Sequence, residues 1–138
     1  MKVDNMAYLP RYQTQGSSGF DFHALEDVEL PPHATRLIRT GLAFSLPCNL
    51  ELQIRSRSSL SLNHGVIVLN APATIDSDYR GEVKIILHNI SNEQFNIKHG
   101  DRIAQGVVSK IQRPFLLNVT DLDETERGDG GFGSTGLN

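Results

Sequence analysis

The sequence has few of the features that mark membrane-bound or secreted proteins. Its longest uninterrupted apolar run, Val66 to Leu69, is four residues long, whereas a membrane-spanning helix needs about 20. The first residues, Met-Lys-Val-Asp-Asn-Met, lack the apolar stretch of a secretory signal. The single cysteine, Cys48, excludes a disulfide within the chain, and its Leu-Pro-Cys-Asn-Leu context predicts an inert, buried thiol. These absences predict a cytoplasmic protein with no membrane partner.

Positive charge is also scarce, because 13 Lys and Arg residues face 16 Asp and Glu residues, for a formal net charge of −3. This balance disfavours direct nucleic-acid binding through bulk electrostatic attraction. The sequence contains no Cys/His pattern with zinc-ligand spacing, no phosphate-binding P-loop and no dinucleotide-binding glycine motif. An anionic ligand would be held by a few arginines, backbone amides or a metal, which favours a small polyphosphate over a polymer.

The chain of 138 residues supports one domain, built from short apolar clusters separated by turn-forming residues. The pattern predicts strands at 20–24, 36–40, 42–46, 51–57, 66–69, 82–88, 95–97 and 102–110. One short helix is expected over 59–63, with Ser58 or Ser59 as N-cap and His64-Gly65 ending it. Consecutive apolar residues at 85–87 predict a strand covered on both faces, which hints at subunit packing. The pattern is typical of an all-β fold, a jelly-roll-like barrel over residues 1–126.

The last twelve residues, 127–138, form a glycine-rich segment with five glycines between positions 128 and 136. Interleaved with them are Arg127, Phe132, Ser134 and Thr135. A guanidinium, an aromatic ring, two hydroxyls and unobstructed backbone N–H groups are suited to grip a phosphorylated, planar ligand. The segment is therefore expected to be a mobile lid that closes on a ligand. A frayed terminus without function is the competing interpretation.

The densest polar cluster, residues 76–82, follows Asn70-Ala71-Pro72-Ala73-Thr74-Ile75. A strand followed by Asn-x-Pro and a charged turn is typical of a β-hairpin that projects from a barrel. Asp76 and Asp78, two residues apart on extended backbone, would point to one face, where a carboxylate could accept a proton from water. A solvated acidic turn is the competing interpretation, but the aromatic ring of Tyr79 favours a pocket wall.

A second polar cluster, Arg55-Ser56-Arg57-Ser58-Ser59-Leu60, closes a strand and opens the expected helix. Hydroxyls, guanidiniums and free N–H groups at a helix start suit phosphate oxygens, although capping and strand-edge roles would explain the same residues. The segment 100–105 is by itself an ordinary turn before a strand. Asp21, between two phenylalanines, is either a buried structural carboxylate, which we favour, or a group that supports a bound metal.

Taken together, these clusters resemble the five ordered motifs of the trimeric dUTP pyrophosphatase (dUTPase) family. The matching segments are, in order, residues 18–21, 57–60, 74–81, 100–105 and 127–136. Each motif alone is unspecific, whereas five in order with compatible spacing over nearly the whole chain are specific.

The resemblance implies a dUTPase-like, β-clip type barrel that forms a homotrimer, with active sites between subunits and a mobile arm, residues 127–138, closing over each. It implies hydrolysis of dUTP to dUMP and diphosphate, which limits uracil incorporation into DNA and supplies dUMP for thymidylate synthesis. Mg²⁺ would be the cofactor, held by the substrate phosphates and water without direct protein ligands. Asp21 would be a candidate hydrogen-bond partner for the metal-bound water.

The resemblance also implies roles for individual residues. Asp76 would activate the attacking water and hold the deoxyribose 3′-hydroxyl. Tyr79 would pack under the sugar and disfavour a 2′-hydroxyl, and Phe132 would stack on uracil. The implied substrate-binding residues are Arg57, Ser58, Ser59, Asn70, Thr74, Ile75, Tyr79, Gln105, Arg127, Phe132, Gly133, Ser134 and Thr135.

Two positions depart from the family pattern, since Ala73 replaces a frequent Gly and Ser18 replaces a usual Ala. Alanine is compatible with the hairpin only if the backbone keeps a negative φ, and uracil recognition depends on that condition. Two other functions remain open at this point: a dCTP deaminase of the same superfamily, whose chains are typically longer, and a nucleotide-binding module without turnover. The Ile75–Tyr79 pattern and the glycine-rich tail favour dUTPase over both.

Overall fold

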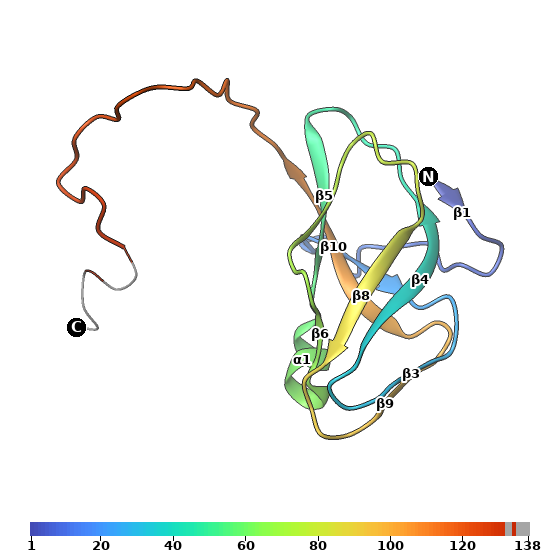
Figure 1. The fold of residues 1–138 in the computed structure, drawn as a ribbon. Coiled ribbons are helices and arrows are strands. Elements are labelled where there is room, and N and C mark those ends of the chain that lie inside the picture. The colour runs from blue at the N-terminus through green and yellow to red at the C-terminus, as the bar shows by residue number, and fades with distance from the viewer. Residues whose placement is uncertain (132–133, 135–138) are drawn as a thin grey trace.

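Short apolar clusters form short strands in the computed structural model, which describes residues 1–131 and 134 (Figure 1). In chain order the elements are β1 (Lys2–Val3), β2 (Phe20–His23), β3 (Val28–Leu30), β4 (Thr35–Ala43), β5 (Leu50–Arg55), α1 (Ser58–His64), β6 (Val66–Val68), β7 (Ala73–Ile75), β8 (Val83–Asn89), β9 (Phe95–Ile97) and β10 (Arg102–Lys110). The expected all-β class with one short helix is confirmed. Within the described residues, no helix has the length and apolar character needed to cross a membrane.

The strands form two four-stranded sheets, ordered β1-β4-β8-β6 and β2-β10-β5-β7, and a two-stranded sheet of β3 and β9. Neighbouring strands are antiparallel throughout these ladders. Buried side chains from all three sheets join in a single apolar core. The strand β5 lies between β7 and β10, so it connects the predicted hairpin to the strand that carries Gln105.

Alternation along β8 places Val83, Ile85 and Leu87 in the core, each at most 1% exposed. Fully burying an aliphatic side chain of this kind stabilises the fold by about 1.5–3 kcal/mol. The second face of this strand is not covered within the single chain, so its cover by a neighbouring subunit stays a prediction. Ile86 is only half-buried on the outer face, where it lies opposite Leu37 of β4, which is 57% exposed.

Two local predictions fail because turns and bulges interrupt the apolar pattern. The strand β4 is continuous where two strands, 36–40 and 42–46, are predicted, because a bulge at Thr40 and Gly41 mimics a strand boundary in the sequence. Cys48 is exposed instead of buried, since the turn that precedes β5 lies at the surface and Leu50 N donates to Pro47 O at 3.0 Å. The sequence pattern does not predict β1, β3 and β7 as separate strands; they are two or three residues long.

The helix α1 begins one residue earlier than expected. Its N-cap is Arg57, without a side-chain capping hydrogen bond, so the prediction of Ser58 or Ser59 as N-cap is wrong. The predicted C-terminal end is confirmed, because Gly65 has the left-handed conformation (φ 62°) that stops a helix.

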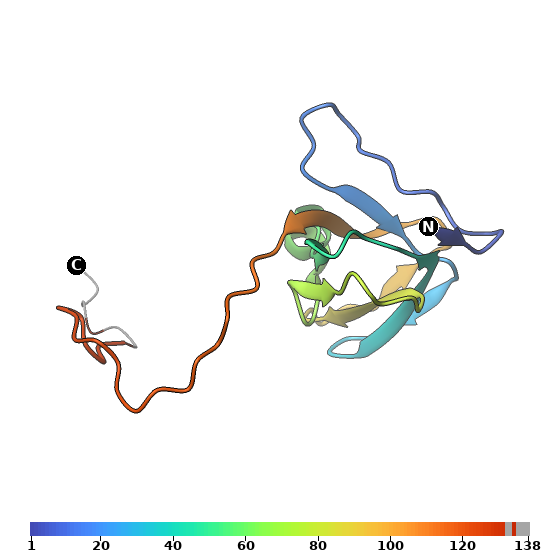
Figure 2. The same cartoon turned by 90° about the horizontal axis from the view of Figure 1, so that it is seen from above.

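The C-terminal segment leaves the body after β10 and leads away from it (Figures 1 and 2). Ile111 N still donates to Asn49 O at 3.1 Å, and Arg113 Nη1 donates to Cys48 O at 2.9 Å. Residues 112–129 are exposed and contain neither helix nor strand. The division of the chain at 126/127 stays a prediction, because regular structure already ends at Lys110.

Candidate active site

A groove of about 630 Å³ lies where β7 and the turn after it meet β4 and β8. We call it the hairpin groove; it is lined by Leu37, Thr74, Ile75, Asp76, Tyr79, Gly81, Glu82 and Lys84. The structure therefore brings together four of the residues predicted from the hairpin motif: Thr74, Ile75, Asp76 and Tyr79. Asn70 is exposed in the turn before β7 and is not among the lining residues.

Hydrogen bonds within the turn hold Asp76 and Tyr79 in place. Tyr79 N donates to Asp76 O at 3.1 Å, and the Tyr79 hydroxyl donates to Glu82 O at 3.1 Å. Arg80 Nη1 donates to Ser77 O at 2.7 Å, and Ser77 is buried. Residues 76–79 thus form a turn, so the expectation that Asp76 and Asp78 share one face of an extended strand is wrong. Only Asp76 of the two lines the groove.

The substitution at Ala73 is compatible with an ordinary strand. Ala73 lies in β7 opposite Ile54 of β5. Among the described residues, His33 is the single non-glycine residue with a positive φ. The condition set by the sequence, a negative φ at position 73, is therefore met, and the added methyl group leaves β7 paired with β5. The predicted β-hairpin is wrong, because β7 pairs with β5 of one sheet, while its chain neighbours β6 and β8 pair with each other in the other sheet.

A second pocket of about 360 Å³ lies at the other edge of the β2-β10-β5 ladder, beside the start of α1. We call it the arginine pocket; it is lined by Gln13, Ser17, Gly19, Asp21, Ser56, Arg57, Ser58, Ser59 and Gln105. It unites the predicted phosphate-contacting residues Arg57, Ser58, Ser59 and Gln105, which come from separate segments of the chain. Gln105 reaches it because it pairs with both Asp21 of β2 and Arg55 of β5.

The carboxylate of Asp21 holds the guanidinium of Arg57 at this pocket. It is 7% exposed and pairs with Arg57 (Nε to Oδ1, 3.2 Å) and Arg102 (Nη1 to Oδ2, 3.3 Å). Arg57 Nη1 also donates to Arg102 O at 2.7 Å. Because both carboxylate oxygens accept from arginines, the geometry favours the structural role of Asp21, which holds the Arg57 guanidinium at the pocket.

The neighbouring His23 is kept neutral more readily than a free histidine. Its ring stacks on Tyr8, with centroids 5.0 Å apart. Burial lowers its pKa from the usual 6.5, Asp21 opposes this shift, and the charges of Arg102 and Arg57 add to it.

Sequence reasoning missed the groove residues Leu37 and Lys84 and the pocket residues Gln13 and Ser17. The first two reach the groove from β4 and β8, and the other two come from the irregular segment before β2. No local pattern marks them, because only pairing between distant segments brings them to the site.

The two cavities share no lining residue within one chain. Among the described residues, those of the C-terminal segment line neither cavity, and Arg127 Nε donates to Gly130 O within its own turn at 2.9 Å. Ser134 N donates to Gly131 O at 3.0 Å. The predicted Phe132, Gly133 and Thr135 lie outside the described residues. In residues 1–131 and 134, no cluster of three His, Cys, Asp or Glu side chains is arranged to hold a metal ion.

Comparisons with known proteins all match this chain to dUTPases. The dUTPase family model matches residues 5–136. A Helicobacter pylori (strain Shi470) protein named deoxyuridine 5′-triphosphate nucleotidohydrolase is 54% identical over 136 residues, covering 99% of this chain and 94% of its own. A Wolinella succinogenes protein of the same name is also 54% identical, with 99% and 91% coverage.

Solved structures agree with these relatives. A dUTPase variant of Staphylococcus bacteriophage 80alpha, solved with dUpNHpp, superimposes with a TM-score of 0.91 at 25% identity, covering 99% of this chain and 96% of its own. A dUTPase variant from phage phi11 of S. aureus, described with a structural Mg(II) ion, shares the fold with a TM-score of 0.83 at 22% identity, covering 90% and 97%.

Proposed function

The chain belongs to the dUTPase family and is a dUTP nucleotidohydrolase; from this premise we propose that it converts dUTP to dUMP and diphosphate at sites assembled between the subunits of a homotrimer. One observation carries the proposal. The hairpin groove and the arginine pocket each hold a different part of the predicted substrate-binding residues, and they share no lining residue. In the proposed trimer, the groove of one subunit and the pocket of a second subunit face the same substrate.

In the proposed reaction, Asp76 accepts the proton of a water molecule whose oxygen attacks the α-phosphorus of dUTP. The bond from the α-phosphorus to the bridging oxygen breaks, and its electron pair leaves with diphosphate. Attack on phosphorus depends chiefly on positioning and charge neutralisation, so one base and a few donors suffice. Asp76 is suited to this role because its exposed side chain lines the groove beside Tyr79.

The remaining groups of the two cavities bind the substrate. In this proposal, Tyr79 packs under the deoxyribose, while Asn70, Thr74 and Ile75 recognise the uracil edge from β7 and the turn before it. Arg57, Ser58, Ser59 and Gln105 of the neighbouring subunit contact the phosphates. Residues 127–138 of a third subunit close over the site, with Arg127, Phe132, Gly133, Ser134 and Thr135 on the substrate.

We assign Mg²⁺ to the substrate and not to a protein cage. The lining residues suit this assignment, because the arginine pocket offers one carboxylate, Asp21, and arginines already engage it. Mg²⁺ keeps several waters and is commonly held through substrate phosphates. When bound, the ion supplies neutralisation of phosphate charge during attack.

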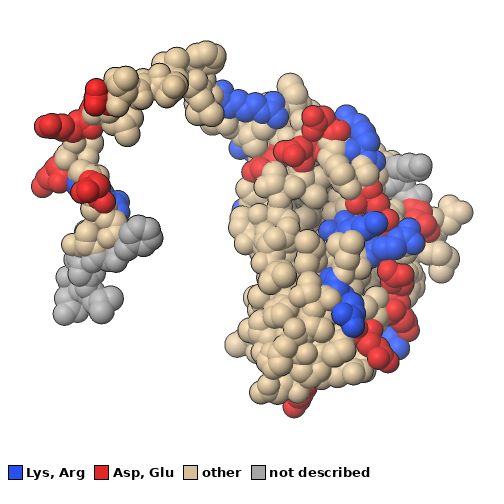
Figure 3. Space-filling view, viewed as in Figure 1, with Lys and Arg blue, Asp and Glu red and all other residues tan. Residues whose placement is uncertain are grey.

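Exposed apolar surface supports association of subunits. Leu37, Leu69 and Ile90 are each more than half exposed on the body. Figure 3 shows a broad area without charged side chains over α1 and β6. The C-terminal segment adds a further exposed group, consisting of Phe115, Leu116, Leu117, Val119 and Leu122. Contiguous apolar surface of this kind is typical of protein–protein contacts.

The proposed setting is the cytoplasm, where the enzyme would limit uracil incorporation into DNA and supply dUMP for thymidylate synthesis. The net charge of −3 supports a small-molecule substrate without direct nucleic-acid binding. The family match favours dUTP hydrolysis over dCTP deamination and over binding without turnover.

The replacement Asp76→Asn tests the proposal, because it preserves size and removes the base. We expect kcat for diphosphate release from dUTP to fall by about 10²–10⁴-fold while the thermal unfolding midpoint stays near that of the wild type. The matched control is Asp78→Asn, an adjacent carboxylate in the same turn that does not line the groove. Activity of Asp76→Asn within a few-fold of the control would refute the assigned role.

A further inference from the structure

The bulge in β4 leaves backbone groups that the sheet does not pair. Arg39 lies opposite Lys84 and Leu42 lies opposite Val83, so Thr40 and Gly41 are extra residues in β4. The Thr40 hydroxyl donates to Val83 O at 2.6 Å. The N–H of Gly41 has no strand partner and donates instead to Glu82 Oε1 at 2.9 Å.

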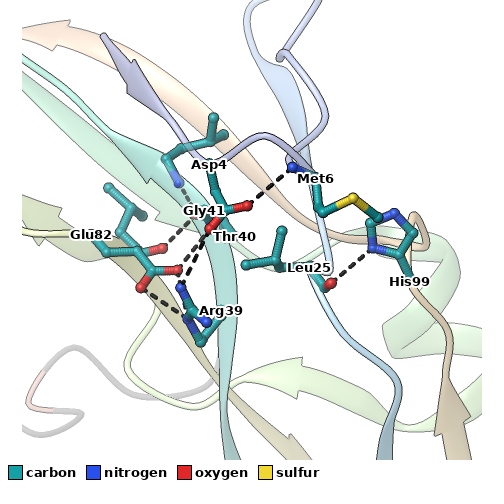
Figure 4. Close-up of polar contacts among 10 residues, drawn as sticks. Asp4, Met6, Leu25, Arg39, Thr40, Gly41, Glu82 and His99 are labelled. Carbon is teal, nitrogen blue, oxygen red and sulfur yellow. Dashed lines mark hydrogen bonds and ion pairs between the residues drawn. The ribbon is translucent and has the colours of Figure 1, made fainter.

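The Glu82 carboxylate that accepts from Gly41 also accepts from the guanidinium of Arg39. Arg39 Nε donates to Glu82 Oε2 at 3.1 Å and to Oε1 at 3.2 Å (Figure 4). The Glu82 side chain is only 22% exposed. Arg39 Nη2 lies 3.9 Å from Asp4 Oδ2 of the N-terminal segment. The Glu82 carboxylate is thus held by a charged donor and a backbone donor from one strand.

The backbone of Glu82 in turn holds the aromatic ring of the groove. Its carbonyl oxygen accepts the Tyr79 hydroxyl at 3.1 Å. Gly81 allows this close approach, since a Cβ at that position would overlap the Tyr79 hydroxyl and ring. Tyr79 is tethered at its other end by its N–H bond to Asp76 O. The ring position therefore depends on where Glu82 is held.

We propose that Glu82 is a positioning residue for substrate selection: its anchorage to the β4 bulge sets the depth of the Tyr79 ring in the hairpin groove and so the space left for a ribose 2′-hydroxyl. The inference rests on the proposed function, because it deepens the role of Tyr79 under the sugar. Loss of the carboxylate leaves the Gly41 N–H unpaired and frees the start of β8 to shift. The ring then retreats, and UTP is excluded less strictly.

The test compares kcat/KM for dUTP with kcat/KM for UTP in Glu82→Ala and Glu82→Gln. We expect Glu82→Ala to reduce the dUTP-to-UTP ratio by about three- to tenfold, chiefly through KM, with a smaller reduction in Glu82→Gln, which keeps one acceptor for Gly41. Tyr79→Phe should reduce the ratio in the same direction. Adding Glu82→Ala to Tyr79→Phe should then reduce it by less than the product of the two separate effects, because both act on the same ring.

Asp27→Ala is the matched control. Asp27 also accepts from a cation and a backbone N–H, namely Lys98 Nζ at 3.0 Å and His99 N at 2.8 Å, and it lines neither cavity. Its replacement should leave the dUTP-to-UTP ratio unchanged. A folded Glu82→Ala protein with the wild-type dUTP-to-UTP ratio would overturn the inference. If Glu82→Ala does not fold, a wild-type ratio in Glu82→Gln would overturn it. Wild-type protein without dUTP hydrolysis would instead overturn the proposed function itself.

Discussion

At the scale of single residues, His23 links the protonation state of one side chain to the stability of the folded protein. It ends β2, two positions after Asp21, and its Nδ1 is buried without a hydrogen bond to any described residue. Protonation would place a third positive charge near Arg57 and Arg102. Burial lowers the pKa of His23, Asp21 opposes this shift, and the charges of Arg102 and Arg57 add to it. The neutral ring is therefore the form compatible with the packed structure.

A pH dependence of stability follows from this lowered pKa. A group whose folded pKa lies below its unfolded value of 6.5 contributes stability that is fully present above pH 6.5 and is lost as the pH falls through the folded pKa. We expect His23→Phe, which keeps an aromatic partner for Tyr8, to flatten the decline in the free energy of unfolding below pH 6.5. Denaturant unfolding over a series of pH values measures this slope.

The control for this experiment is His33→Asn, which leaves His23 intact and suits the positive φ of 57° at that surface turn. It should retain the decline of the wild type. An unchanged decline in His23→Phe would show that another group is responsible.

At the scale of elements, the body and the C-terminal segment depend on different interactions. The core is formed by the strands up to β10, and the last contacts of the segment with the body that we describe are those of Ile111 and Arg113. Removing residues after Glu126 therefore leaves every core contact in place. It deletes the proposed lid, residues 127–138, which includes Arg127.

Truncation after Glu126 is expected to give a folded protein whose kcat/KM for dUTP falls by at least about tenfold, because the proposed lid would exclude water and complete the binding site. Thermal unfolding and diphosphate release measure the two effects separately. Truncation after Gly136 is the matched control, since it keeps the entire segment that the family model covers. Normal dUTP hydrolysis by the shorter form would show that the lid is dispensable.

At the scale of the whole molecule, the separation of the two cavities predicts complementation between inactive variants. Asp76→Asn disables the hairpin groove, and Arg57→Ala disables the arginine pocket. If a site combines the groove of one subunit with the pocket of the next, mixed trimers contain some sites with both halves intact. Random assortment of equal amounts in a cyclic trimer gives about a quarter of the sites in that state.

We expect co-refolding of the two variants to restore activity toward that fraction, while each variant refolded alone stays inactive. Mixing the assembled proteins without unfolding is the control for subunit exchange. Light scattering would establish the mass of the assembly. A monomeric mass, or no recovery after co-refolding of folded, associated protein, would place both halves of the site within one chain and contradict the intersubunit arrangement.

Local sequence patterns alone predicted several strands, the end of the helix and the family. Apolar alternation located β9 and β10 at their observed limits, and Gly65 ended α1 where a left-handed residue was expected. Five ordered motifs were enough to indicate the family. These features depend on residues close together in the chain, so the sequence alone carries them.

The tertiary structure decided what depends on contacts between distant segments. It revealed that Thr40 and Gly41 form a bulge inside one strand, that Asp21 holds Arg57, and that Glu82 connects the bulge to Tyr79. It also divided the predicted site residues between two cavities of the same chain. No local pattern encodes these relations, because strand pairing and ion pairs across many tens of residues arise only when the sheets pack around their common core.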